Sequence, residues 1–239
     1  AFNGGIARVW ELARDMHVRD HPHVLLWLFQ AYAVGTGMYG AQVWSTNWLT
    51  MDKTLDNPIH VKHMGFLKRT LRIKRSAHTW SVLRETGQIP MQFYWFRSAV
   101  RFWNNMIDAN SCIVRNVMRA DVQLMRENYV HCWSYQLRNA MRELQHAERF
   151  VDNMFYADKI ELKTCCEDKK SLYEHVWNQA ALYRPQDEAI PDFPGKKAVM
   201  YNHWFGVSNE VLSGKGGMPQ YLSTTLPKKV MRDMARFRL

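Results

Sequence analysis

The residues best suited to chemistry are the cations between Val61 and Arg75. This stretch contains six Lys and Arg residues and no Asp or Glu. Lys and Arg neutralise the phosphates of a nucleic-acid backbone, and such contacts position a protein without reading much sequence. The residues predicted to contact phosphates here are Lys62, Lys68, Arg69, Arg72, Lys74 and Arg75.

A helix must position most of these cations. Asn57 followed by Pro58 predicts its start, because Asn caps helix N-termini and proline suits the first helical position. At about 100° per residue, the apolar residues fall on one side of this helix: Ile59, Met64, Phe66, Leu67 and Leu71. The basic residues fall on the other side, so the helix is expected to be amphipathic with a positive solvent face.

An aromatic helix is predicted to follow the basic one. Gly87 is expected to end a short helix over residues 81–86, because glycine readily adopts positive φ. Pro90 then starts a helix in which apolar residues recur at helical spacing: Tyr94, Trp95, Ala99, Phe102, Trp103, Met106 and Ile107. Arg97 and Arg101 on this helix are further candidates for phosphate contacts. Trp80 is either a base-stacking residue or, as favoured, part of the core.

A second positive face is predicted at the end of the chain. Residues 227–239 form a basic amphipathic pattern in which four cations are candidate phosphate contacts: Lys228, Lys229, Arg232 and Arg236. More than a hundred residues separate this face from the first.

The run from Phe66 to Met106, FLKRTLRIKRSAHTWSVLRETGQIPMQFYWFRSAVRFWNNM, resembles the segment that follows the polymerase domain in non-LTR (LINE-type) retroelement reverse transcriptases. Residues 27–44 resemble that family's thumb region, and residues 197–205 and 218–239 resemble its later phrases. The resemblance implies a polymerase relative without a catalytic palm. It also implies that the family's polymerase carboxylates lie before this region and its Cys/His cluster beyond it.

Strand-like alternation is scarce, so the predicted fold is all-α, an irregular multi-helix bundle with thumb-like N-terminal helices packed on a larger helical unit. Three segments are expected: 1–56 as the thumb-like unit, 57–183 as the basic and aromatic core, and 184–239 as Pro/Gly-rich loops with a basic helix. Helices are predicted over 5–17, from His21 to about Val34, and over 112–127, 133–155, 171–183 and 197–205. Gly35, Gly37 and Gly40 are expected where backbones approach closely. Within 112–127, the residues at helical spacing are Ile113, Val117, Asp121, Leu124 and Met125.

Other strings that suggest chemistry are incomplete. Phe155–Lys159 (FYADK) resembles the Y-x-D-D of polymerases, but Lys159 replaces the second carboxylate and would repel a divalent cation. The glycine-rich string 213–217 lacks the spacing of a phosphate loop. Neither His131 with Cys132 nor His60 with His63 has a second pair to complete a zinc site. We expect no catalytic residue, no metal, no cofactor and no small-molecule substrate.

Composition restricts the function further. The 239 residues carry 32 Lys and Arg against 22 Asp and Glu, a net charge of +10, which favours a polyanionic partner. No apolar stretch is long enough to cross a bilayer, so a soluble protein is expected. Cys112, Cys132, Cys165 and Cys166 show no disulfide framework, so reduced thiols in an intracellular compartment are expected. The chain begins with Ala1, which fits either removal of a targeting peptide or a segment of a longer protein.

The favoured hypothesis is a non-catalytic RNA-binding protein derived from a reverse transcriptase. It would be a structural component of a large ribonucleoprotein such as a mitochondrial ribosome, contacting ribosomal RNA and neighbouring proteins. One alternative is the C-terminal segment of an active retroelement polyprotein. Another is a protein–protein scaffold whose basic faces meet acidic subunits.

Overall fold

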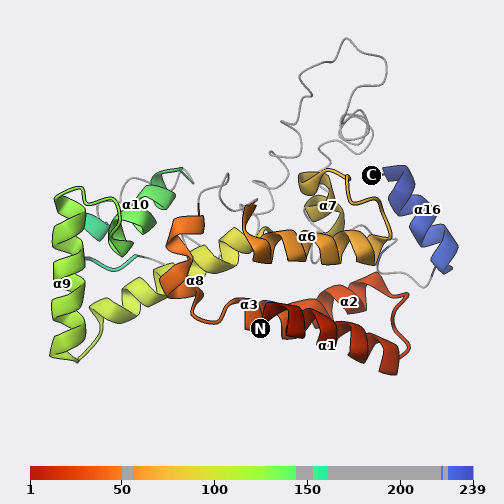
Figure 1. Cartoon of the computed structure of the whole chain (residues 1–239), viewed down its shortest axis with the longest axis horizontal. Coiled ribbons are helices and arrows are strands. Elements are labelled where there is room, and N and C mark those ends of the chain that lie inside the picture. Colours follow the sequence, from red (N-terminus) through yellow and green to blue (C-terminus); the bar gives the residue numbers. More distant parts are fainter. Residues whose placement is uncertain (50–55, 144–152, 161–221, 223–225, 239) are drawn as a thin grey trace, which may run out of the picture. The chain divides into compact units, whose positions relative to one another are not determined.

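The computed structural model describes residues 1–49, 56–143, 153–160, 222 and 226–238 (Figure 1). The regular elements in these ranges are all helices, which confirms the predicted all-α class. Contacts group the chain into two compact units, unit 1 (Ala1–Gly37, Val61–Pro90 and Lys170–Leu239) and unit 2 (Met38–His60 and Met91–Lys169). Each of these units combines stretches that are separate in sequence, whereas the sequence predicted three consecutive segments. That division stays a prediction.

Unit 1 is built around the aromatic ring of Phe29. Its described elements are α1 (Phe2–Asp15), α2 (Pro22–Leu28), the π-helix η1 (Phe29–Val34), α3 (Gly35–Gly37), most of α6 (Pro58–Leu71), α7 (Thr79–Thr86) and α16 (Lys228–Arg238). Phe29 stacks on His63 at 5.0 Å and on Phe66 at 4.5 Å between ring centroids. The α6 residues Met64, Phe66, Leu67 and Leu71 are buried, as the amphipathic pattern predicts, so this face of α6 packs on the core.

Glycine allows α1 to pack closely against η1. A Cβ atom at Gly5 would lie 2.5 Å from Thr36 Oγ1 and 2.9 Å from Ala33 Cα. The predicted close approach at Gly35 is wrong, because a Cβ there would meet nothing within 4 Å. At Gly40 a Cβ would meet only the Trp44 side chain, at 3.7 Å, so the predicted close backbone approach is wrong there too. Glycine suits this position for another reason, because its φ is +64°.

Helix α7 (Thr79–Thr86) is almost wholly buried. Helix α7 begins at Thr79, two residues before the predicted start, and ends where Gly87 adopts φ +60°, as predicted. Trp80 is only 9% exposed, so it is a core residue and does not offer a stacking surface. This short helix therefore joins the unit 1 core.

Unit 2 has its core on the aromatic helix. Its described elements are α4 (Ala41–Trp44), the 3-10 helix η2 (Thr46–Trp48), the start of α6, α8 (Met91–Ile107), α9 (Cys112–Arg126) and α10 (Trp133–Glu143). Trp95, Ala99 and Trp103 are buried as predicted, whereas Phe102 is only partly buried. The predicted cap is also present, because Asn57 Oδ1 accepts a hydrogen bond from the Ile59 amide at 2.8 Å.

The buried face of α9 differs from the predicted stripe. The helix buries Met118, Val122 and Met125, while Ile113 is 71% exposed and Val117 is 62% exposed. The remaining members of the predicted stripe, Asp121 and Leu124, do not enter the core either. Leu124 is exposed, and Asp121 accepts hydrogen bonds from the backbone amides of Trp133 and Ser134. Asp121 therefore caps α10, an interaction between helices that the local pattern of α9 does not contain.

The helix predicted over 133–155 is described only in part. Helix α10 covers its beginning, and Leu137, Ala140 and Met141 on this helix are buried. Residues 144–152 lie outside the described ranges, as do the helices predicted over 171–183 and 197–205 and the glycine-rich string 213–217. Among the described helices, none has both the length and the apolar content needed to cross a membrane.

Candidate nucleic-acid interface

The C-terminal end of α6 fixes the orientation of its last basic residues. The Ile73 amide donates to the Lys68 carbonyl and the Arg72 amide to the Arg69 carbonyl, each at 3.1 Å, which is the Schellman pattern. Arg72 takes the left-handed position of this motif with φ +57°, where glycine is usual. An L-residue in that conformation is strained by about 1–2 kcal/mol, so the surrounding contacts must hold it there.

Three of the predicted cations have partners inside the protein. Lys68 Nζ donates to the Arg75 carbonyl at 2.7 Å, and burial lowers the pKa of Lys68. The Arg69 guanidinium lies 4.7 Å from the centre of the Trp10 ring, a cation–π contact. Arg72 forms an ion pair with Asp20. Lys68, Arg69 and Arg72 therefore make contacts within the protein in addition to contributing positive charge.

The other three cations of this segment face solvent. Lys62, Lys74 and Arg75 have exposed side chains, and no carboxylate among the described residues pairs with them. Their charges are therefore available to a polyanion. His78, close to Lys68, adds no charge at neutral pH, because burial and then the Lys68 charge lower its pKa to about 4.

One arginine from each of the two predicted positive faces lines the same hollow. A hollow in unit 1 is lined by Arg72 from the end of α6, by Arg232 from α16 and by Arg19 from the turn before α2. Asp20, Thr70 and Leu222 also line it. Two of these arginines have carboxylate partners, since Arg72 pairs with Asp20 and Arg232 lies 3.3 Å from an Asp233 oxygen. The three arginines still exceed the two carboxylates by one charge, so the hollow stays positive. Its cavity volume of about 20 Å³ admits water or the oxygens of an anion and excludes a nucleobase.

Arg19 is the residue that sequence analysis missed. It lies in a short turn with no neighbouring run of cations, and only the tertiary structure brings it to the same hollow as Arg72 and Arg232. Asp20 follows Arg19 directly and cancels its charge, so this part of the sequence shows no local excess of positive charge.

The remaining predicted cations are distributed between the units. Lys229 and Arg236 have exposed side chains on α16 in unit 1, beside Arg232, and the Lys228 side chain is not described. Arg97 is half-buried and Arg101 is exposed, and both lie on α8 in unit 2. The structure therefore does not group Arg97 and Arg101 with the hollow.

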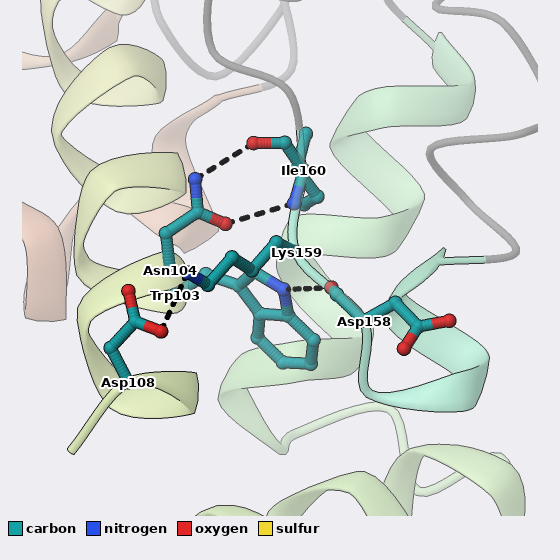
Figure 2. Close-up of polar contacts among 6 residues, drawn as sticks. All are labelled: Trp103, Asn104, Asp108, Asp158, Lys159 and Ile160. Carbon is teal, nitrogen blue, oxygen red and sulfur yellow. Dashed lines mark hydrogen bonds and ion pairs between the residues drawn. The ribbon is translucent and has the colours of Figure 1, made fainter.

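The polymerase-like string 155–159 has a structural role. Trp103 Nε1 donates to the Asp158 carbonyl at 2.9 Å, and Asn104 bonds both backbone groups of Ile160, at 2.7 and 2.9 Å (Figure 2). Lys159 Nζ lies 2.6 Å from an Asp108 oxygen. The Asp158 carboxylate is exposed and points away from these contacts (Figure 2). The string thus attaches this part of the chain to α8.

The candidate zinc pairs occupy different environments. His63 is buried and stacks on Phe29, while His131 is exposed and Cys132 is buried. Within the described ranges, no three His, Cys, Asp or Glu side chains gather closely enough to hold a metal ion. Cys112 and Cys132 are free thiols, and Cys165 and Cys166 lie outside the described residues.

Comparison of this chain with protein-family models, with curated proteins and with solved structures gives no match. The arrangement of basic groups in unit 1 is therefore the basis for a functional proposal.

Proposed function

We propose that this chain is a non-catalytic RNA-binding protein that holds backbone phosphates on unit 1. The observation that carries the proposal is the hollow where Arg19, Arg72 and Arg232 converge from three separate parts of the sequence. Guanidinium groups bind phosphate oxygens through paired N–H donors, and Arg is favoured where such geometry matters. Lys62, Lys74 and Arg75 have exposed side chains in unit 1 and would add further phosphate contacts.

Asp20 has a positioning role in this proposal. Its carboxylate pairs with Arg72, whose backbone is held in a left-handed conformation directly after α6. The pair is partly exposed, so its own contribution to stability is small, about 0–1 kcal/mol. A carboxylate at this position would keep the guanidinium beside the hollow. A phosphate there would meet Arg19 first, because Arg232 also has a carboxylate partner, Asp233.

The cellular setting is part of the same proposal. We infer a retroelement-derived protein that serves as a structural component of a large ribonucleoprotein such as a mitochondrial ribosome. The resemblance of residues 66–106 to the post-polymerase segment of LINE-type reverse transcriptases supports this setting, together with the net charge of +10. Hydrogen bonds from α8 hold the backbone at Asp158 and Ile160, and this structural use of the polymerase-like string supports a non-catalytic role.

Salt-dependent RNA binding tests the proposal. Each lost phosphate contact should reduce the slope of log affinity against log salt by about 0.7 for a single strand. The double variant Arg19→Glu/Arg232→Glu should therefore bind a short single-stranded RNA at least tenfold more weakly, with a slope smaller by about 1.4. Fluorescence anisotropy at several salt concentrations measures both quantities.

A matched control keeps this test specific. Arg119→Glu/Arg142→Glu makes the same charge change at two exposed residues of unit 2. If both double variants lose affinity equally, net charge explains the binding and the hollow has no special role. If neither loses affinity, the proposal is wrong. Thermal unfolding of each variant checks that the fold is retained.

Partner analysis separates the cellular settings. Intact mass of the natural protein near 28 kDa supports a separate ribonucleoprotein component, and a chain several-fold larger supports a retroelement polyprotein. Association with other proteins that survives complete RNase digestion would favour the scaffold alternative.

A further inference from the structure

A second hollow lies in unit 2 and has walls of another kind. Thr46 and Asn47 of η2 line it together with Tyr135, Gln136 and Asn139 of α10, and Thr46 and Gln136 are in direct contact. Val130 and His131, from the turn before α10, complete it. The cavity volume is about 280 Å³, just below the roughly 300–1,000 Å³ of pockets for drug-sized ligands. It has room for one flat heterocycle.

The chemistry of the walls restricts the ligand. No Lys, Arg, Asp or Glu occurs among the described lining residues, so the hollow does not select a phosphate or another small ion. Carboxamides, a hydroxyl and a phenol dominate instead. Asn and Gln side chains are the groups that proteins use to pair with the edges of nucleobases, and aromatic rings stack on base faces.

Thr46 and Gln136 form a ready pair of hydrogen-bonding groups. Thr46 Oγ1 donates to Gln136 Oε1 at 2.9 Å, which leaves the hydroxyl oxygen able to accept a bond. Gln136 Nε2 makes only a long contact of 3.5 Å with the His131 carbonyl, so its amide can still donate. An adjacent acceptor and donor match the donor–acceptor edge that unpaired bases present.

The walls are held in place before any ligand arrives. Asp121 caps the first turn of α10, and Trp133 Nε1 donates to the Gln42 carbonyl at 2.9 Å. The His131 ring packs edge-on against Tyr129, with 5.8 Å between ring centroids. A preformed site loses less conformational entropy on binding, so these contacts favour affinity.

From this geometry we propose that the unit 2 hollow binds one unpaired nucleobase. The inference rests on the proposed RNA binding, and it adds a contact to a base where unit 1 contacts phosphates. Tyr135 and His131 would flank the base, and Thr46 and Gln136 would bond its edge. The ribose and phosphate would stay outside, because the walls carry no cation for them.

The experiment compares two polymers with the same backbone. The full chain is titrated with a short single-stranded RNA and with an abasic ribose-phosphate oligomer of equal length. Stacking and bonding one base is worth about tenfold in affinity, so RNA should bind about tenfold more tightly than the abasic oligomer. Equal affinity for the two polymers would contradict the proposal.

Two variants locate the preference. Gln136→Glu keeps an acceptor for Thr46 but removes the amide donor, and Val130→Trp fills the hollow with a side chain while leaving both groups intact. Each should reduce the preference for RNA to about twofold or less without changing the salt slope. Asn116→Asp, the same type of change at an exposed residue of α9, should leave the preference intact. A preference that survives both hollow variants would show that the base is bound elsewhere.

Free nucleosides distinguish this inference from the proposed function. Saturation-transfer NMR with adenosine, guanosine, cytidine and uridine tests the hollow without any phosphate. Nucleoside contacts that disappear in Val130→Trp would support a base site even if the chain bound no RNA. If no nucleoside makes contact and RNA shows no advantage over the abasic oligomer, the base site is refuted while phosphate binding by unit 1 can still stand.

Discussion

The hollows of the two units differ in charge and in size, and both differences have consequences. The unit 1 hollow is small, about 20 Å³, and is lined by three arginines and one aspartate. The unit 2 hollow is larger, about 280 Å³, and its described walls carry no Lys, Arg, Asp or Glu. A phosphate needs charge and little space, whereas a base needs room and uncharged hydrogen-bonding groups. Under the two proposals, unit 1 would contact the RNA backbone and unit 2 would contact a base.

Removal of the solvent-facing charges of unit 1 should give the largest effect. The triple variant Lys62→Glu/Lys74→Glu/Arg75→Glu should weaken RNA binding about 100-fold at low salt and reduce the log–log slope by about 2, because three phosphate contacts become repulsive. These residues are better targets than Lys68, Arg69 and Arg72, which also make internal contacts. Anisotropy titrations measure affinity and slope. An unchanged slope would exclude this surface as the phosphate track.

Loss of the α10 cap should affect unit 2 alone. Asp121→Ala leaves the amides of Trp133 and Ser134 without their acceptor, which should lower the free energy of unfolding by about 2 kcal/mol. The salt slope of RNA binding should not change, because no unit 1 cation is touched. Urea unfolding measures the loss. Asp108→Ala, which removes only an exposed pair with Lys159, should cost less than about 1 kcal/mol.

Acidification should destabilise unit 1 through His78. Burial depresses the pKa of His78 to about 4 in the folded protein, against 6.5 for an ordinary histidine, so below pH 6.5 the unfolded chain binds this proton more tightly. Stability is therefore lost as pH falls from about 6.5 to 4, by about 1–3 kcal/mol after allowance for partial exposure. The difference in unfolding free energy between the native chain and His78→Asn, followed against pH, isolates this contribution. A pH-independent difference would contradict it.

Arg72→Gly should give the smallest change in stability, and it tests the backbone strain at Arg72 separately from the role of Arg72 in RNA binding. Arg72→Gly relieves the left-handed conformation but removes the ion pair with Asp20. The gain and the loss are each about 1 kcal/mol, so stability should change by less than about 1 kcal/mol in either direction. RNA affinity should still fall several-fold, with a slope smaller by about 0.7. A variant with native affinity would remove Arg72 from the phosphate site.

Helix ends show how far local sequence reasoning extends. Schellman hydrogen bonds end helices at His17, Arg72, Gly87, Asn128 and Ala157, all with positive φ. Only Gly87 was predicted, because glycine alone signals this conformation without an energetic penalty. Arg72 pairs with Asp20 and Ala157 packs against the unit 2 core, and such contacts between residues distant in sequence leave no local signal.

The buried faces of α6 and α9 also show what local sequence patterns can and cannot predict. The α6 pattern correctly predicted its buried side, because charged and apolar residues segregate there. The α9 stripe was assigned incorrectly, because Ile113 and Val117 have the same spacing as a core face but remain exposed. Asp121 was placed in that stripe, whereas its carboxylate caps another helix.

The amino-acid sequence alone determined the all-α class, the amphipathic basic helix with its Asn57 cap, and the excess of positive charge. These features depend on periodicity and composition, which are local properties of a chain. Tertiary structure alone decided that Arg19, Arg72 and Arg232 meet in one hollow and that η2 and α10 enclose another. Long-range packing sets those distances, because side chains far apart in sequence become neighbours only when their helices bury a common core.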